Sequence, residues 1–129
     1  MHLRAPLVLL LLASPLSLKA QQPSEPVPAD SASPPPVVLD SACLVPAHPD
    51  ILRQAGIEGR VLVTFVVDTT GAVDTTTVRV LASSHRLFER PTRAAVATCR
   101  FAPGRVAGRV VRVRMQQAVN FTLPAPPPR

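Results

Sequence analysis

The last third of this chain contains the feature that most constrains its fold, a run in which apolar and polar residues alternate. The odd-numbered positions are apolar except for Gln117, and they hold Val111, Val113, Met115, Val119, Phe121 and Leu123. The even-numbered positions are polar except for Ala118, and they hold Arg112, Arg114, Gln116, Asn120 and Thr122. A period of two over this length predicts a β-strand with one buried face and one solvated face.

A β-hairpin is expected upstream of this strand. Residues 60–67 are apolar on both faces, which is typical of a central strand that is covered on each side. Asp68 suits the start of a type I turn, and Gly71 supplies a positive φ. The return strand, residues 73–82, is rich in β-branched side chains.

Two short helices complete the expected fold. The first lies in HPDILRQAGI, with Pro49 at a first helical position and Gly56 as a left-handed cap from which Ile57 folds back on Leu52. The second is expected to begin near Pro91, because proline disrupts a helix interior. The order α-β-β-α-β predicts an α+β fold, with two short helices packed on a three-stranded antiparallel sheet.

The two ends of the chain are expected to lie outside this domain. Residues 1–20 combine Arg4, an apolar run and Ala20 in the layout of a secretory signal peptide, and a retained membrane anchor is the alternative. Residues 21–42 are rich in proline, serine and alanine, which predicts a disordered tether. Residues 124–129 form a similar tail, so the folded domain is residues 43–123.

Cys43 and Cys99 are the only two cysteines. Thiols of an exported protein are more often paired than free, so we expect a structural disulfide between them. The alternative is two buried, unpaired thiols. Because they lie 56 positions apart, they do not form a redox motif.

The mature part of the chain carries a net positive charge. Without Arg4 and Lys19, twelve arginines oppose eight acidic residues, a net charge of +4. Five of these arginines lie in one stretch of sequence, a basic window that contains no acidic residue: Arg100, Arg105, Arg109, Arg112 and Arg114. This favours an acidic partner or surface. It does not favour nucleic acid, because no aromatic residue interleaves with these arginines to stack on bases.

The polar residues do not form a pattern typical of an enzyme or a metal site. His48 and His85 lack Cys, His or Asp companions at ligand spacing, and both are read as surface or packing residues. Ser84 next to His85 is not a nucleophile and base, because adjacent side chains rarely face each other. We therefore expect neither catalysis nor a cofactor or metal.

The ordered set of motifs resembles the TonB carboxy-terminal domain family. The matching positions are Pro49, Arg53, Gly56, Ile57 and Gly59; Val61, Val63, Phe65, Val67, Asp68 and Gly71; Ser83 and Ser84; Arg100, Phe101 and Pro103; and Gly108, Val111 and Phe121. Three positions depart from the family pattern, with His48 and Cys99 in place of aromatic residues and Ala118 where proline is frequent.

This resemblance implies a periplasmic module that docks the TonB box, a short extended segment of outer-membrane transport receptors, on its last strand. By this resemblance the peptide-binding residues are expected to be Val110, Val111, Arg112, Val113, Arg114, Met115, Gln116 and Gln117. Their backbone groups are expected to bind by strand addition, while Arg112 and Arg114 attract an acidic segment.

Two alternatives remain open at this stage. If residues 1–20 stay in the inner membrane, the domain faces the periplasm from an anchor, and inner-membrane motor proteins become partners. If the domain transmits no energy, it is a structural, self-pairing domain of the envelope, and its exposed edge strand allows a homodimer.

Overall fold

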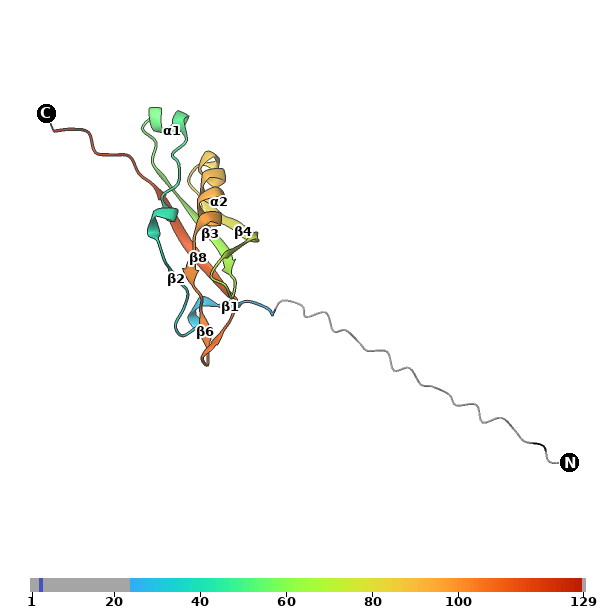
Figure 1. The fold of residues 1–129 in the computed structure, drawn as a ribbon. Helices are drawn as coiled ribbons and strands as arrows, with labels where there is room; N and C mark the ends of the chain where they lie inside the picture. Colours follow the sequence, from blue (N-terminus) through green and yellow to red (C-terminus); the bar gives the residue numbers. More distant parts are fainter. Residues whose placement is uncertain (1–2, 4–23, 129) are drawn as a thin grey trace.

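The computed structural model describes Leu3 and residues 24–128, so the expected signal segment, apart from Leu3, lies outside the described residues. Figure 1 shows an elongated body in which one long sheet is flanked by helices, and its α+β class is the expected one. Across Leu3 and residues 24–128, none of the helices has the length and apolar character needed to span a bilayer.

The central strand of the main sheet is β3 (Gly59–Val67). It pairs antiparallel with β4 (Val73–Ser83) on one side and with β8 (Val113–Phe121) on the other. A fourth strand, β1 (Val27–Pro28), joins the other edge of β8 in parallel. The sheet order is therefore β1-β8-β3-β4, one strand more than the sequence predicts.

The hydrophobic core lies on one face of this sheet, under helix α2 (Glu89–Thr98) and the preceding 3-10 turn η3 (Arg86–Phe88). Phe65, Phe88 and Phe121 are buried there, and the rings of Phe88 and Phe121 are 4.2 Å apart. On the other face, Arg60 is exposed and Leu62 is only half-buried. The expectation that β3 is covered on both sides is therefore wrong for its first half, because the helix layer covers one face.

Local signals place both helices to within two residues, but Pro49 is the N-cap of α1 and not its first helical residue, because its ψ of 129° is extended. Helix α1 (Asp50–Gln54) ends at Gly56, whose φ is 68°, and the N–H of Ile57 donates to the carbonyl of Leu52 at 2.8 Å, as in a Schellman motif. Pro91 is the third residue of α2. It is tolerated there because N–H groups of the first turn have no partner within the helix.

The predicted turn between β3 and β4 is confirmed. The N–H of Gly71 donates to the carbonyl of Asp68 at 3.0 Å, and the φ of Gly71 is 87°. A Cβ at Gly71 would also collide with the carbonyl oxygen of Phe101. Glycine is therefore required here both for its backbone conformation and for the close approach of the neighbouring chain.

The last strand is shorter than the alternating pattern predicts. Residues upstream of it form a separate hairpin of β6 (Arg105–Val106) and β7 (Arg109–Val110), turned by Ala107 and Gly108 at φ values of 48° and 78°. Two successive positive φ values fit the tight primed turns of hairpins. The apolar residues of the two hairpin strands, Val106 and Val110, occupy even positions, whereas those of β8 occupy odd positions, so the alternation changes between the hairpin and β8.

Residues 24–44 lie along the domain, which differs from the tether expected over residues 21–42. After β1 come the 3-10 turn η1 (Ala29–Ser31), the strand β2 (Val37–Val38) and the turn η2 (Ser41–Leu44). β2 pairs antiparallel with β5 (Phe101–Ala102). The predicted disulfide between Cys43 and Cys99 is confirmed, and it joins η2 to the end of α2.

Candidate strand-docking edge

The edge of β8 that faces away from β3 is the candidate site. The carbonyl of Arg112 accepts a 2.9 Å hydrogen bond from the N–H of Val27, so this carbonyl points toward that edge. Backbone groups alternate between the two sides of a strand, so those of every second residue after Arg112 face the same way. These residues are Arg114, Gln116, Ala118 and Asn120.

Contacts within the chain already involve five of the eight predicted binding residues. Val110 lies in β7, and the N–H of Val111 donates to the carbonyl of Gly104 at 3.0 Å. Arg112, Val113 and Arg114 lie opposite β1. Met115, Gln116 and Gln117 lie beyond the end of β1, on the stretch of edge that no other described strand covers.

The free stretch continues past the predicted residues to Phe121. Ala118, Val119, Asn120 and Phe121 were not predicted as binding residues, although the alternating pattern that indicates the strand extends through them. The side-chain amide of Gln117 donates to the carbonyl of Ala118 at 2.9 Å. An incoming N–H group would compete with this amide for a carbonyl that faces the edge.

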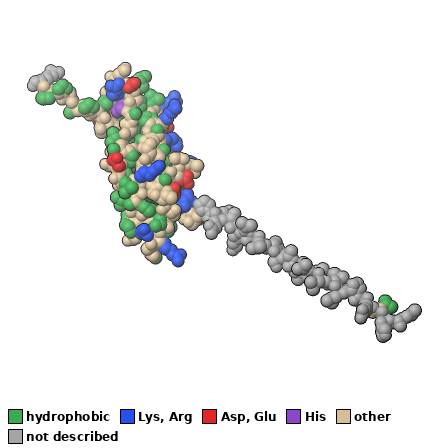
Figure 2. All heavy atoms as spheres, viewed as in Figure 1, with side chains coloured by type: hydrophobic (Ala, Val, Ile, Leu, Met, Phe, Trp, Pro, Cys, Tyr) green, Lys and Arg blue, Asp and Glu red, His purple; other side chains and the backbone are tan. Residues whose placement is uncertain are grey.

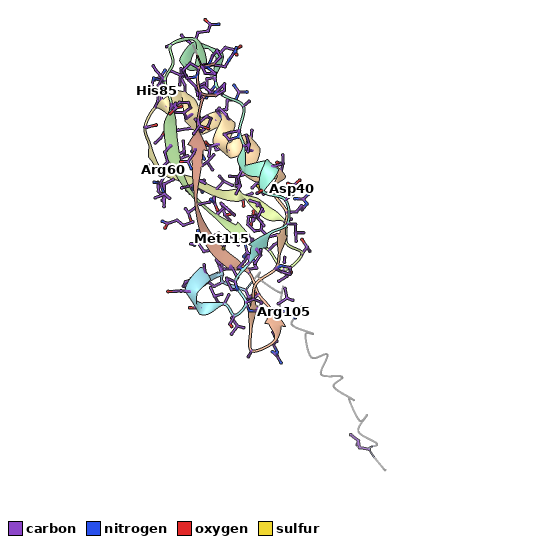
Figure 3. The ribbon with its side chains drawn as sticks, turned by 90° about the vertical axis from the view of Figure 1, so that its left-hand side faces the viewer. Asp40, Arg60, His85, Arg105 and Met115 are labelled. Carbon is purple, nitrogen blue, oxygen red and sulfur yellow. A yellow bond between two sulfur atoms is a disulfide. The ribbon has the colours of Figure 1, made fainter. Side chains whose placement is uncertain are left out.

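A shallow cavity of about 420 Å³ opens where β1 ends and the free edge begins. It is lined by Pro26, Pro28, Ala29 and Asp30 of the amino-terminal segment, by Thr64 of β3, and by Arg114, Met115 and Gln116 of β8. Figure 3 shows Met115 on β8 beside this segment. A side chain of a strand docked at Gln116 would reach this cavity.

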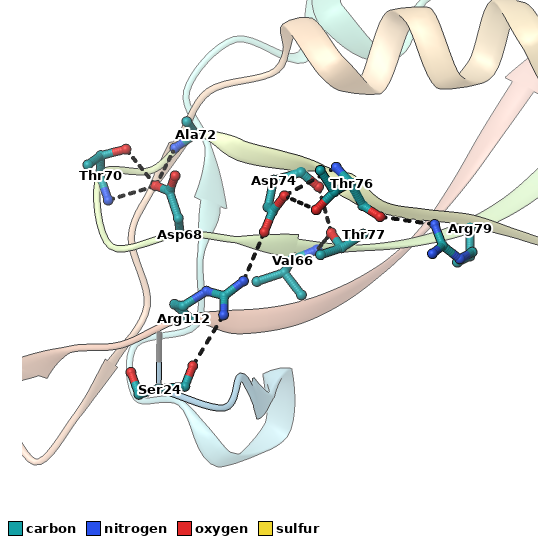
Figure 4. Close-up of polar contacts among 10 residues, drawn as sticks. All are labelled: Ser24, Val66, Asp68, Thr70, Ala72, Asp74, Thr76, Thr77, Arg79 and Arg112. Atoms are coloured by element: carbon teal, nitrogen blue, oxygen red, sulfur yellow. Dashed lines mark hydrogen bonds and ion pairs between the residues drawn. The ribbon is translucent and has the colours of Figure 1, made fainter. Parts of the chain in front are cut away.

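The two arginines expected to attract an acidic segment have different environments. Arg112 donates to the carboxylate of Asp74 at 2.9 Å and to the carbonyl of Ser24 at 3.3 Å (Figure 4). Its charge is therefore balanced inside the domain. Arg114 is exposed and lies directly on the candidate edge, so of these two arginines it is the one available to an acidic ligand.

The carboxylates beside this network are held in their charged form. The hydroxyl of Thr76 donates to Asp74 at 2.6 Å and, with the N–H of Thr76 and the charge of Arg112, lowers the pKa of Asp74 despite its partial burial. Burial alone would raise the pKa of Asp68. Hydrogen bonds from the hydroxyl and N–H of Thr70 and from the N–H of Ala72 outweigh it, so the pKa of Asp68 is lowered.

The remaining arginines of the basic window do not form one patch. Figure 2 shows Lys and Arg side chains spread over the visible face, with some at the lower end, where Figure 1 places β6. The guanidinium of Arg105 donates to the carbonyl of Gly108 at 2.9 Å, within the β6–β7 hairpin. The window in the sequence is therefore divided among Arg100, which follows α2, the β6–β7 hairpin, and the start of β8.

The histidines and Ser84 have structural contacts. The ring of His48 makes edge contacts with Phe88 and Phe121 at centroid distances of 5.5 and 5.8 Å, in the position where the family has an aromatic residue. The Nδ1 of His85 accepts from the N–H of Leu87, and the Oγ of Ser84 accepts from the N–H of Arg60. Among the described residues, no three His, Cys, Asp or Glu side chains form a group that could hold a metal ion.

The geometry defines a small α+β domain with a free sheet edge suited to strand pairing. The chain belongs to the family described as Gram-negative bacterial TonB protein C-terminal, whose family model matches residues 45–123. The resemblance read from the sequence is thereby confirmed.

One sequence relative and one solved structure support this assignment. Protein TonB of Pseudomonas aeruginosa strain PAO1 is 39% identical over 67 residues, which cover 51% of this chain and 19% of that protein. The chain thus spans about a fifth of that relative's length. The solution NMR structure of the Pseudomonas aeruginosa TonB CTD matches with a TM-score of 0.57 and 30% identity, over 71% of this chain and 90% of that chain.

Proposed function

We propose that this chain is a periplasmic, non-catalytic binding module of TonB-dependent transport across the outer membrane. Its ligand is the TonB box of an outer-membrane receptor, which pairs as an added strand with the free edge of β8. The observation that carries the proposal is the uncovered stretch of this edge, residues 115–121, within a family-typical fold.

The chemistry of the edge supports a peptide ligand. Gln116, Ala118 and Asn120 direct their N–H and carbonyl groups outward, which gives an extended segment several backbone hydrogen bonds. The cavity beside Gln116 can take one side chain, and Arg114 favours a ligand with an acidic residue. Affinity then comes from the backbone, and selectivity comes from these two features.

The proposed location follows from the leading segment and the disulfide. An apolar leader ending at Ala20 directs export, and a bridge between Cys43 and Cys99 persists in an oxidising compartment such as the periplasm. Cleavage after Ala20 predicts a mature chain beginning at Gln21, which mass spectrometry of the purified protein detects. An intact leader would instead support an anchored protein coupled to inner-membrane motor proteins.

The test is an NMR titration of the oxidised protein with TonB-box peptides of receptors from the same bacterium. The controls are scrambled peptides and peptides N-methylated at alternate residues, which keep the side chains but remove backbone donors. We expect amide shifts at Gln116, Ala118 and Asn120, and no response to the N-methylated peptides. Shifts confined to residues outside β8 and the amino-terminal segment beside it, or no shifts, would contradict docking at this edge.

A self-pairing structural domain is the second candidate, because the same free edge can pair with another copy of the chain. Sedimentation measurements distinguish it from peptide docking. A concentration-dependent dimer that box peptides do not dissociate would favour the structural role over the transport role.

A further inference from the structure

The amino-terminal segment covers the upstream end of the same edge that the proposed ligand would use. Val27 lies opposite Val113, and Pro28 lies opposite Arg114, in a parallel pair. The hydrogen bond from the N–H of Val27 to the carbonyl of Arg112 measures 2.9 Å. The chain therefore carries its own short strand for this edge.

The contacts of this strand are few. Glu25 and Asp30 on either side of β1 are exposed, Val27 is half-buried, and η1 has no side-chain cap. Besides the pairing with β8, the segment is held by the guanidinium of Arg112, which donates to the carbonyl of Ser24 at 3.3 Å. Few bonds would have to break to release it.

The chain is held more firmly directly downstream. Ala32 is 7% exposed, and the N–H of Ser33 donates to the carbonyl of Arg105 at 2.7 Å. The N–H of Arg105 donates in return to the carbonyl of Pro34 at 3.1 Å. These contacts divide the segment into a weakly held part, residues 24–31, and a fixed part that begins near Ala32.

We propose that residues 24–31 act as an intramolecular competitor that blocks the upstream part of the β8 edge and is displaced when a peptide pairs along all of β8. This inference rests on the proposed function for the identity of the incoming peptide. While β1 is in place, a peptide can pair only with residues 115–121. A ligand that needs the outward backbone groups of Arg112 and Arg114 binds only the molecules in which β1 has detached, so its apparent affinity is lowered in proportion to their fraction.

The decisive variant is Val27→Pro in the full-length mature chain. It removes the N–H that Arg112 accepts from and leaves the fixed part of the segment unchanged. Glu25→Pro is the matched control, because it adds a proline to the same segment at an exposed position outside the β1–β8 pair. In Val27→Pro, we expect faster hydrogen exchange of the Arg114 amide and about fivefold tighter binding of box peptides, the factor that corresponds to one net hydrogen bond.

A second probe makes the test independent of the receptor. A synthetic peptide with the sequence of residues 24–33, SEPVPADSAS, is added at about millimolar concentration, the effective concentration that a short flexible linker provides. We expect it to slow the exchange of the Arg114 amide in Val27→Pro but not in the wild-type chain, whose own segment occupies the edge.

The outcomes separate the two proposals. Equal exchange of Arg114 in all three proteins, with no effect of the synthetic peptide, overturns the competitor. Faster exchange of the Arg114 amide in Val27→Pro, without any gain in affinity for a box peptide that the wild type binds, also overturns it. If the synthetic peptide protects Arg114 but no box peptide binds any of the proteins, the competitor stands and the proposed function fails.

Discussion

Arg112 and Asp74 lie 38 residues apart in the sequence and form an ion pair of 2.9 Å in which both side chains are largely shielded, with exposed fractions of 17% and 29%. The pair connects the start of β8 to the start of β4 across the carboxy-terminal end of β3. Since Arg112 also donates to Ser24, it links three parts of the chain that are distant in sequence.

Removing this arginine should lower stability, whereas removing its exposed neighbour should not. Arg112→Ala leaves the shielded Asp74 without its charged partner, and we expect a loss of about 1–2 kcal/mol in the free energy of unfolding. Arg114→Ala is the control and should change it by less than about 0.5 kcal/mol. Urea unfolding measures the free energy of unfolding of both variants. Equal losses in the two variants would show that the ion pair of Arg112 with Asp74 adds nothing specific to stability.

Acid should destabilise the domain through Asp68 and Asp74. Both pKa values are lowered from 3.8 in the folded chain, so the unfolded chain binds protons first as the pH falls. The stabilisation is fully present above about pH 4 and is lost as the pH drops through the folded pKa values. In Asp74→Asn, the slope of unfolding free energy against pH should be shallower below pH 4, and an unchanged slope would contradict this assignment.

Loss of the disulfide should have a larger effect than either charge. The bridge between Cys43 and Cys99 closes a loop with a sequence separation of 56. The chain-entropy relation predicts a stabilisation of about 4 kcal/mol for a loop of this size. The double variant Cys43→Ser/Cys99→Ser should therefore unfold more than about 15 °C below the oxidised protein in a thermal scan. Chemical reduction of the wild type should give a similar shift.

Two glycines with positive φ values should respond differently to substitution by alanine. Gly56 has open space around it, so Gly56→Ala should cost about 1 kcal/mol from backbone strain alone. At Gly71, the added Cβ also meets the carbonyl of Phe101, and Gly71→Ala should cost at least about 2 kcal/mol more. Chemical unfolding of both variants tests this order. Equal losses would mean that β5, which carries Phe101, shifts freely.

A proline at the candidate edge should abolish docking without unfolding the domain. The N–H of Gln116 faces the free side of β8, so Gln116→Pro removes a donor for the ligand but none that β3 uses. We expect box-peptide affinity to fall at least about tenfold, with the thermal midpoint nearly unchanged. Thr122→Pro, one residue past the strand, is the control and should bind normally. Retained affinity in Gln116→Pro would move the binding site elsewhere.

The parts of the fold that were predicted correctly depend on neighbouring residues. Asp68 and Gly71 define a turn within four positions, and Gly56 and Ile57 cap a helix that ends beside them. Such signals are complete in a short window. The disulfide joins residues that are distant in sequence, but its prediction needed only two cysteines in a chain that is expected to be exported.

The strand β1 was not predicted because its composition favours a different conformation. Val27 stands between Pro26 and Pro28, and prolines cannot donate to a sheet. An edge strand of two residues needs only one donor, however, and the N–H of Val27 is the one that faces β8. Which carbonyl it meets depends on the folded position of Arg112, 85 positions away, and no local pattern records this.

The candidate site was predicted only in part, because contacts between residues that are distant in sequence decide which of its residues are free. The alternation of apolar and polar residues identifies β8 as a strand with one buried face, but it does not show which of its residues are already paired. The ion pair of Arg112 with Asp74 and the separate hairpin at Val110 both arise from contacts across the fold. Met115, Gln116 and Gln117 are the predicted residues that remain on the uncovered stretch.

The bridge between Cys43 and Cys99 also determines how the domain would respond to mechanical tension. The covalent route from Ser24 to β8 crosses directly from one sulfur to the other and omits residues 44–98. A pull between the amino-terminal segment and a partner held on β8 would therefore bypass the long hairpin and both α-helices. Such a pull would first detach β1, and residues 44–98 would be spared from unravelling.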